Sequence, residues 1–184
     1  VARASANAKK MPMYRYLREI FGMKEVGMPA EENYVLPNPM MVVIEGGQHA
    51  DQSTDLQEYM ISAIGNVSVK ENVRMGVETY LALKKVLKEK GYNTNVGNEG
   101  AFAPPGMPAN ETPLELIGEA IEKAGYKAGK DIGISLDPAV SEIYEPSAGS
   151  GGKYQLTKDE KDLTSLPFST IPASRSRQDE SSAP

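Results

Sequence analysis

Acidic, amide and imidazole side chains follow the apolar runs of this 184-residue sequence, and several of them stand next to glycine. In α/β folds, sites form where strands end, and glycine allows the backbone to approach a ligand closely. The first such segment, 45–51 (Glu-Gly-Gly-Gln-His-Ala-Asp), follows the apolar run 40–44 and contains the single histidine, His49. His49 could act on a ligand there, or it could be the surface imidazole of a solvated turn.

Two further segments carry carboxylates in places that suit catalysis. Gln57 and Glu58 begin a second mixed apolar run, where they could hold a substrate or could be exposed edge residues. Glu99 stands in the loop Gly-Asn-Glu-Gly-Ala-Phe-Ala-Pro (97–104). Such a loop could bury the carboxyl and make it a general acid, since burial disfavours the ionised form; the alternative is a plain turn with an exposed acid.

The fourth candidate is Asp137, which follows the predicted strand 131–136. A carboxylate at the C-terminal end of a barrel strand is a common ligand of Mg²⁺, which prefers oxygen. Asp137 could instead cap the segment that follows it, and Glu142 could assist a metal ligand or be solvated. Together these residues indicate carboxylate and Mg²⁺ chemistry on part of an α/β barrel, without selecting a reaction.

The composition excludes several other classes of site. The sequence has 20 Lys and Arg against 25 Asp and Glu, and this net charge of −5 is unfavourable for coating nucleic acid or an anionic membrane. It has no cysteine and one histidine, so thiolate chemistry and multi-histidine metal centres are excluded. No apolar run is long enough to span a membrane, and residues 1–10 have no secretion-signal core, so we expect a soluble, cytoplasmic protein.

Hydrophobic spacing and turn residues predict helices over 1–17, 70–90 and 112–124, and strands over 40–44, 57–64 and 131–136. Pro12 should interrupt or restart the first helix, Gly91 should end the second, and Thr112 should begin the third as the N-cap of a capping box. The predicted apolar face of the second helix is Val73, Val77, Tyr80, Leu81, Val86 and Leu87, and its predicted solvated face is Lys84, Lys85, Lys88 and Lys90.

This order of elements indicates an α/β fold that needs more strands to close its sheet. We predict no further strand after residue 136, and we expect the polar segment after about Thr164, rich in Pro and Ser, to be disordered. Because the sequence begins inside a predicted helix, we also expect it to have been cut from a longer protein.

Eight motifs, in order along the chain, resemble the enolase family: segments 8–17, 36–41, 46–51, 56–61, 83–91, 97–104, 119–126 and 136–144. The resemblance runs from Val1 to about Leu163. It implies an α/β fold that is the first part of an enolase-type TIM-like barrel, opening strand, strand, helix, helix, strand and left incomplete. We therefore assign residues 1–162 to the N-terminal part of the enolase barrel domain and residues 163–184 to a divergent, disordered tail.

The resemblance implies a glycolytic lyase, phosphopyruvate hydratase, that uses Mg²⁺ and reversibly dehydrates 2-phospho-D-glycerate to phosphoenolpyruvate. By this resemblance Glu99 would be the proton donor, Glu58 would assist at the leaving hydroxyl, and His49 would lie on a loop that closes over the substrate. Gln57 would bind the substrate together with His49 and Glu58. Asp137 would be the first of three carboxylate ligands of Mg²⁺.

The resemblance also implies parts that this sequence does not match: a lysine base, two more metal carboxylates, a phosphate-binding arginine and an N-terminal capping domain. We therefore expect the chain alone to be inactive; the alternative is a non-catalytic fragment that acts only as a binding or interaction piece. Val42, Glu45, Asn98 and Ala101 depart from the family pattern. The family further implies a homodimer for the full-length protein, and its members also occur at the cell surface or are secreted.

Overall fold

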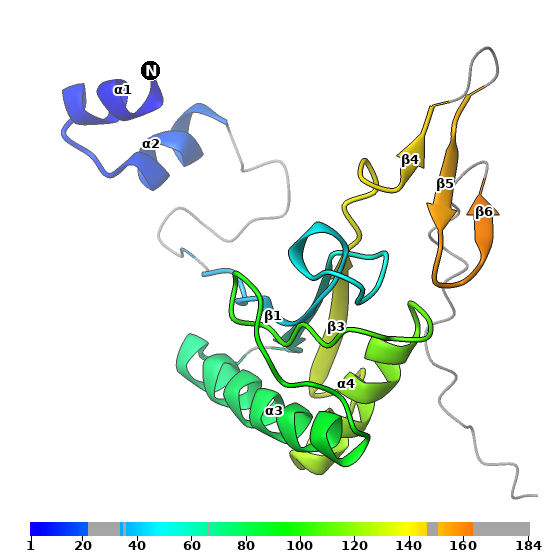
Figure 1. The fold of residues 1–184 in the computed structure, drawn as a ribbon. Coiled ribbons are helices and arrows are strands. Elements are labelled where there is room, and N and C mark those ends of the chain that lie inside the picture. Colours follow the sequence, from blue (N-terminus) through cyan, green and yellow to red (C-terminus); the bar gives the residue numbers. More distant parts are fainter. Residues whose placement is uncertain (22–33, 35, 66, 147–150, 164–184) are drawn as a thin grey trace, which may run out of the picture. The chain divides into compact units, whose positions relative to one another are not determined.

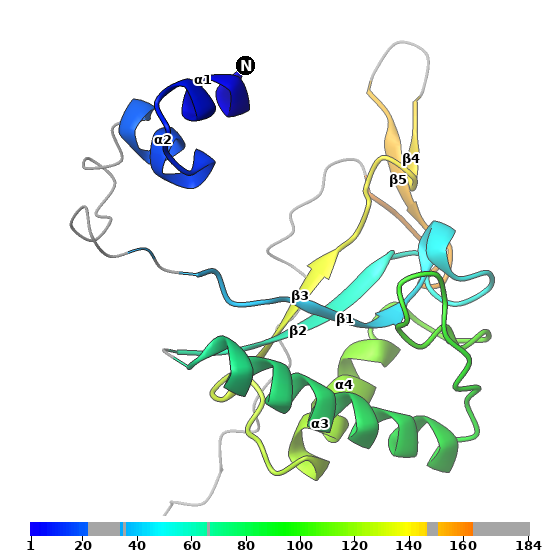
Figure 2. The same ribbon diagram turned by 90° about the vertical axis from the view of Figure 1, so that its left-hand side faces the viewer.

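The structure, a computed structural model, describes residues 1–21, 34, 36–65, 67–146 and 151–163 (Figures 1 and 2). The chain divides into two units, Val1–Pro37 and Asn38–Pro184. The expectation of disorder after about Thr164 falls on residues outside the described ranges. No helix within the described ranges is both long and apolar enough to cross a membrane.

The first unit contains two short helices, α1 (Ala2–Ala8) and α2 (Met13–Ile20). Pro12 precedes α2 with an extended backbone, and its carbonyl accepts a hydrogen bond from the Tyr16 amide at 3.1 Å. Proline is well suited to this place, because its fixed φ fits a helix start and its missing N–H is not needed there. The predicted restart of the helix at Pro12 is confirmed.

The second unit is built on an antiparallel sheet with the strand order β1 (Met41–Glu45), β2 (Glu58–Ala63), β3 (Ile132–Asp137). All three strands were predicted. Because β2 runs against both neighbours, the C-terminal ends of β1 and β3 meet the N-terminal end of β2 at one edge. The sequence order strand, strand, helix, helix, strand is also confirmed, although the described residues contain no closed barrel.

Two helices, α3 (Val69–Glu89) and α4 (Thr112–Lys123), pack side by side on one face of this sheet (Figures 1 and 2). They bury one face of each strand, because side chains alternate between the two sides of a sheet. The largest fully buried apolar residues of this core come from both layers and from the segment between α3 and α4: Ile44, Tyr59, Ile61, Leu83, Leu87, Phe102, Met107, Ile117, Ile121 and Ile132.

The buried face of α3 differs from the predicted one. Val86 and Leu87 are buried as expected, but Val73, Val77 and Leu81 are exposed. The buried face of the helix instead combines the apolar Met75 and Leu83 with small and polar residues, among them Gly76, where a Cβ would overlap the Met41 side chain. Close approach of helix and sheet therefore decides which side of α3 is buried, and that contact is not encoded in the apolar spacing alone.

The helix ends follow the sequence in α3 but not in α4. The Ser68 hydroxyl caps α3 by accepting a hydrogen bond from the Glu71 amide at 3.1 Å, and Gly91 follows its end with φ +80°. The predicted capping box at Thr112 is wrong. Thr112 is already the first helical residue, because Glu111 before it has helical backbone angles and gives no side-chain cap.

The prediction that no strand follows residue 136 is also wrong. A second antiparallel sheet, with the order β4 (Tyr144–Glu145), β5 (Lys153–Leu156), β6 (Lys161–Leu163), lies in the same unit. These strands have two to four residues, and most of their side chains are polar. Such short segments do not show a two-residue period in the sequence.

The predicted solvated face of α3 is confirmed, since Lys84, Lys85, Lys88 and Lys90 are exposed.

Candidate active site

Three acidic residues form one row across the β1–β3 sheet, at the end where β1 and β3 finish and β2 begins. Glu45 pairs with Glu58, and Glu58 pairs with Asp137. Directly paired side chains lie on the same face of an antiparallel sheet. The adjacent row contains Tyr59, which is fully buried beneath the helices, so the acidic row lies on the face away from α3 and α4.

His49 and Glu99 join this row from two different loops. His49 ends a short 3₁₀ helix, Gly47–His49, that follows β1, and its Nδ1 lies 3.7 Å from Glu58 Oε1. One nitrogen of His49 and one carboxylate oxygen each of Glu58 and Glu99 lie within 4.8 Å of one another. The structure therefore brings together three of the five predicted site residues, and it adds Asp137 beside Glu58 through the strand register.

The surroundings of Glu58 disfavour its charged form. Burial raises the pKa of the Glu58 carboxyl, and the negative charges of Glu99 and Asp137 raise it further. His49 and a hydrogen bond from Gln57 partly offset this shift by stabilising the carboxylate. Glu58 therefore holds a proton more readily than an ordinary surface glutamate does.

Glu99 itself is exposed, so the alternative in which its loop buries it is wrong. The loop is nevertheless firmly held. The Gly97 amide donates to the Ala101 carbonyl at 3.0 Å, and the Tyr80 hydroxyl donates to the Gly100 carbonyl at 2.8 Å. The Glu99 side chain is therefore accessible to a ligand, while hydrogen bonds fix the backbone that carries it.

The loop buries a different carboxylate, that of Glu45. Glu45 is fully buried, and its Oε1 accepts hydrogen bonds from the amides of Glu99 at 3.2 Å and of Ala101 at 3.0 Å. Its Oε2 has no hydrogen-bond partner among the described residues. In the sequence, Glu45 begins the candidate segment 45–51 and departs from the family pattern, but it had no predicted role of its own.

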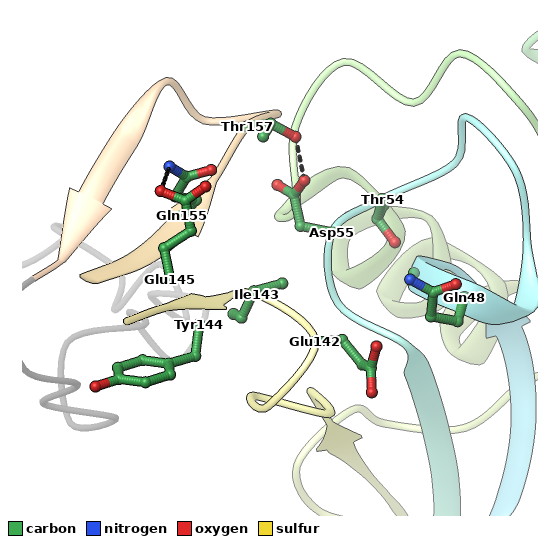
Figure 3. Close-up of a pocket in the computed structure, with 10 residues that line it drawn as sticks. Gln48, Thr54, Asp55, Glu142, Ile143, Tyr144, Glu145, Gln155 and Thr157 are labelled. Carbon is green, nitrogen blue, oxygen red and sulfur yellow. Dashed lines mark hydrogen bonds between the residues drawn. The ribbon is translucent and has the colours of Figure 1, made fainter. Parts of the chain in front are cut away.

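The segment that leads into β2 is fixed by Asn110, which sequence reasoning missed. The Asp55 amide donates to Asn110 Oδ1 at 2.8 Å, and Asn110 Nδ2 donates to Asp55 Oδ2 at 2.8 Å. Asn110 also donates from its backbone to Asp159 at 3.0 Å, and Thr157 donates to Asp55 (Figure 3). The turn between β5 and β6 thereby holds the chain two residues before Gln57.

Gln57 is half-buried, and its carbonyl accepts a hydrogen bond from the Gly46 amide at 2.8 Å. Glu142 is exposed, as the solvated alternative expects. It lines a pocket of about 350 Å³ between the loop after β1 and the second sheet, together with Gln48, Asp55 and Gln155 (Figure 3). This pocket is separate from the group formed by His49, Glu58 and Glu99, none of which lines it.

Asp137 is exposed at the end of β3. Its Oδ1 accepts a hydrogen bond from the Ala139 amide at 3.1 Å, and the residues that follow form a turn rather than a helix, so Asp137 is no helix cap. An exposed carboxylate beside Glu58 fits a hard cation such as Mg²⁺. His49 fits Mg²⁺ less well, because imidazole nitrogen suits softer metals.

The fold and this cluster of carboxylates define an enzyme-like site on part of an α/β barrel. The family model described as "Enolase, C-terminal TIM barrel domain" matches residues 33–171, which is most of the chain. The protein therefore belongs to this family. Membership indicates a lyase-type function of the enolase superfamily, whose domains generally use Mg²⁺.

Proposed function

We propose that this chain carries the acid half of an enolase active site, for the reversible dehydration of 2-phospho-D-glycerate to phosphoenolpyruvate. The observation that supports this most is the meeting of His49, Glu58 and Glu99 within 4.8 Å on the open face of the sheet. These three residues come from three separate segments. Their convergence matches the roles that the enolase resemblance implies.

In the dehydration, a base takes a proton from the carbon next to the substrate carboxylate, and the bond to the hydroxyl on the neighbouring carbon breaks. The resemblance assigns that base to a lysine that this sequence does not match. Glu99 donates a proton to that hydroxyl, so it departs as water. Glu58 acts beside it, and its raised pKa lets it share a proton at this position. Gln57 binds the substrate, and His49 covers it from the loop after β1.

Asp137 would hold Mg²⁺ as one of its carboxylate ligands. The bound ion would stabilise the negative charge that develops on the substrate carboxylate. The sequence offers no match to the lysine that the resemblance assigns as base, nor to the two further metal carboxylates. We therefore expect the 184-residue chain, mixed with 2-phosphoglycerate and Mg²⁺, to form no phosphoenolpyruvate. Ultraviolet absorbance, which phosphoenolpyruvate would increase, measures this.

The proposal is tested in a chimera in which residues 38–163 replace the matching segment of an active enolase. We expect turnover from the chimera, and we expect Glu99→Gln to lower kcat at least about 100-fold, because a lost general acid costs that much. The matched control is Glu122→Gln on the exposed side of α4, which should leave kcat unchanged. A folded chimera in which Glu99→Gln has full activity would refute the proposed role.

The alternative, a non-catalytic binding or interaction piece, stays a prediction, as do the homodimer and the cytoplasmic location of the full-length protein. The same chimera separates the two functions. A binding piece requires no proton donor at Glu99, so a folded chimera without any turnover would favour it.

A further inference from the structure

The loop that carries Glu99 is anchored to β1 on the C-terminal side of that residue, at Phe102. The Phe102 amide donates to the Val43 carbonyl at 3.0 Å, and the Glu45 amide donates to the Phe102 carbonyl at 2.9 Å. These backbone bonds fix the end of the loop. The amides of Glu99 and Ala101 donate instead to a side chain of β1.

That group is the Glu45 carboxylate. A single oxygen, Oε1, accepts from the amides of Glu99 and Ala101, one at Glu99 itself and one two residues later. Because Glu45 is fully buried, its acceptor oxygen is shielded from water.

Gly97, two residues before Glu99, lies close to both the Glu45 side chain and the loop that carries His49. A Cβ added to Gly97 would overlap the Glu45 carboxylate and would lie 3.1 Å from the His49 carbonyl oxygen. The Glu45 side chain, Gly97 and the His49 backbone therefore meet at one point. This close packing leaves little room for either loop to shift without the other.

We propose that Glu45 is a positioning residue that holds Glu99 beside His49 and Glu58, an inference that rests on the proposed function of Glu99. Glu45 faces no substrate, since it is fully buried, and it acts through the backbone of the loop. The length of its side chain is essential, because the carboxylate must reach from β1 to the amides of residues 99 and 101. Its negative charge is secondary.

Three substitutions separate reach from charge. Glu45→Gln keeps the length of the side chain and one acceptor oxygen. Its NH₂ group replaces Oε2, the oxygen that has no hydrogen-bond partner among the described residues. Glu45→Asp keeps the charge but shortens the side chain by one methylene. Glu45→Ala removes both. We expect Gln to behave like the natural residue, and we expect Asp to behave like Ala.

Two nuclear magnetic resonance readouts on the 184-residue chain test this without any turnover. The first is the hydrogen-exchange protection of the Glu99 and Ala101 amides, which should fall at least about tenfold in Glu45→Asp and Glu45→Ala and change little in Glu45→Gln. The second is the nuclear Overhauser contact between the His49 ring and the Glu99 side chain, which should persist in Glu45→Gln only. Core amides of α3, such as that of Leu87, serve as the internal control.

The proposal is overturned if Glu45→Asp keeps both signals, or if Glu45→Gln loses them while the Leu87 amide stays protected. If Glu45→Ala does not fold, the Asp and Gln variants still decide the question. In the chimera described above, Glu45→Asp should lower kcat with little change in KM. Glu45→Gln should have the kcat of the chimera with the natural Glu45. An inactive chimera with the expected exchange pattern would reject the proposed function but keep the positioning role.

Discussion

The two faces of the β1–β3 sheet differ in role: one forms the core and the other carries the candidate site. The face beneath the helices is closed within this chain, and its residues Tyr59 and Ile61 are fully buried. The opposite face carries Glu58, Ser62 and Asp137, which are partly or fully exposed, and also the buried Glu45 and Met60. Since side chains alternate along a strand, the same short segments supply both the core and the site. Substitutions on one face should therefore change stability, and substitutions on the other should change electrostatics.

The largest effect is expected on the helix-covered face, for Leu83→Ala. Leu83 is fully buried in α3, so its truncation removes apolar contact and leaves a cavity. We expect a loss of about 2–5 kcal/mol in the free energy of unfolding, measured by urea denaturation. Lys84→Ala, on the exposed side of the same helix, is the control and should change it by less than about 0.5 kcal/mol. Equal effects of both changes would contradict the division between the faces.

The next largest effect belongs to the loop on the open side. In Gly97→Ala the new Cβ overlaps the buried Glu45 carboxylate, so the loop must move. We expect a loss of about 1–3 kcal/mol in the free energy of unfolding, from overpacking. The matched control is Gly118→Ala within α4, where a Cβ meets nothing within 4 Å and should stabilise the protein by about 0.5–1 kcal/mol. A neutral Gly97→Ala would show that the loop is not held at this point.

A smaller loss is expected at the start of α3. Ser68→Ala removes the hydroxyl that accepts from the Glu71 amide, and an N-cap of this kind contributes about 1 kcal/mol. Ser68→Asp keeps an acceptor and should restore most of the stability. Thermal melts of the three proteins measure this. The same melting temperature for Ser68→Ala and the natural chain would show that the cap has no energetic role.

The smallest effect is pH-dependent and lies on the open face. The folded-state pKa of Glu58 is raised, so folding favours its protonated form, and the stability that this form gives is lost as the pH rises through that pKa. Glu58→Gln cannot ionise, so at pH 7 it should be the more stable protein, by less than about 1 kcal/mol. The difference should vanish below pH about 4. A difference that grows as the pH falls would have the wrong sign.

The sequence predicted the elements of the fold better than their contacts. Apolar runs between Pro, Gly and Asn predicted all three strands of the main sheet, because such signals are local. The exposed Val73 and Val77 and the buried Gly76 were not predicted, because the buried side of a helix depends on its neighbours. The second sheet was missed because its strands are short and polar.

In the candidate site, too, the sequence predicted the residues better than their contacts. The residue types at His49, Glu58 and Glu99 could be singled out from their loops, and the enolase resemblance gave each a role. Their approach to within 4.8 Å depends on three segments that are distant in sequence. The burial of Glu45 depends on a loop more than fifty residues later, which no local pattern encodes.

The most direct test of a shared site on the open face is the pKa of the Glu58 carboxyl, measured by carbon-13 resonance titration in the natural chain and in Glu99→Gln. With both residues present, that pKa should lie above the ordinary value for glutamate, since burial and the neighbouring charges raise it. Removal of the Glu99 charge should lower it. An identical Glu58 pKa in the two proteins would mean that these carboxylates do not share one site.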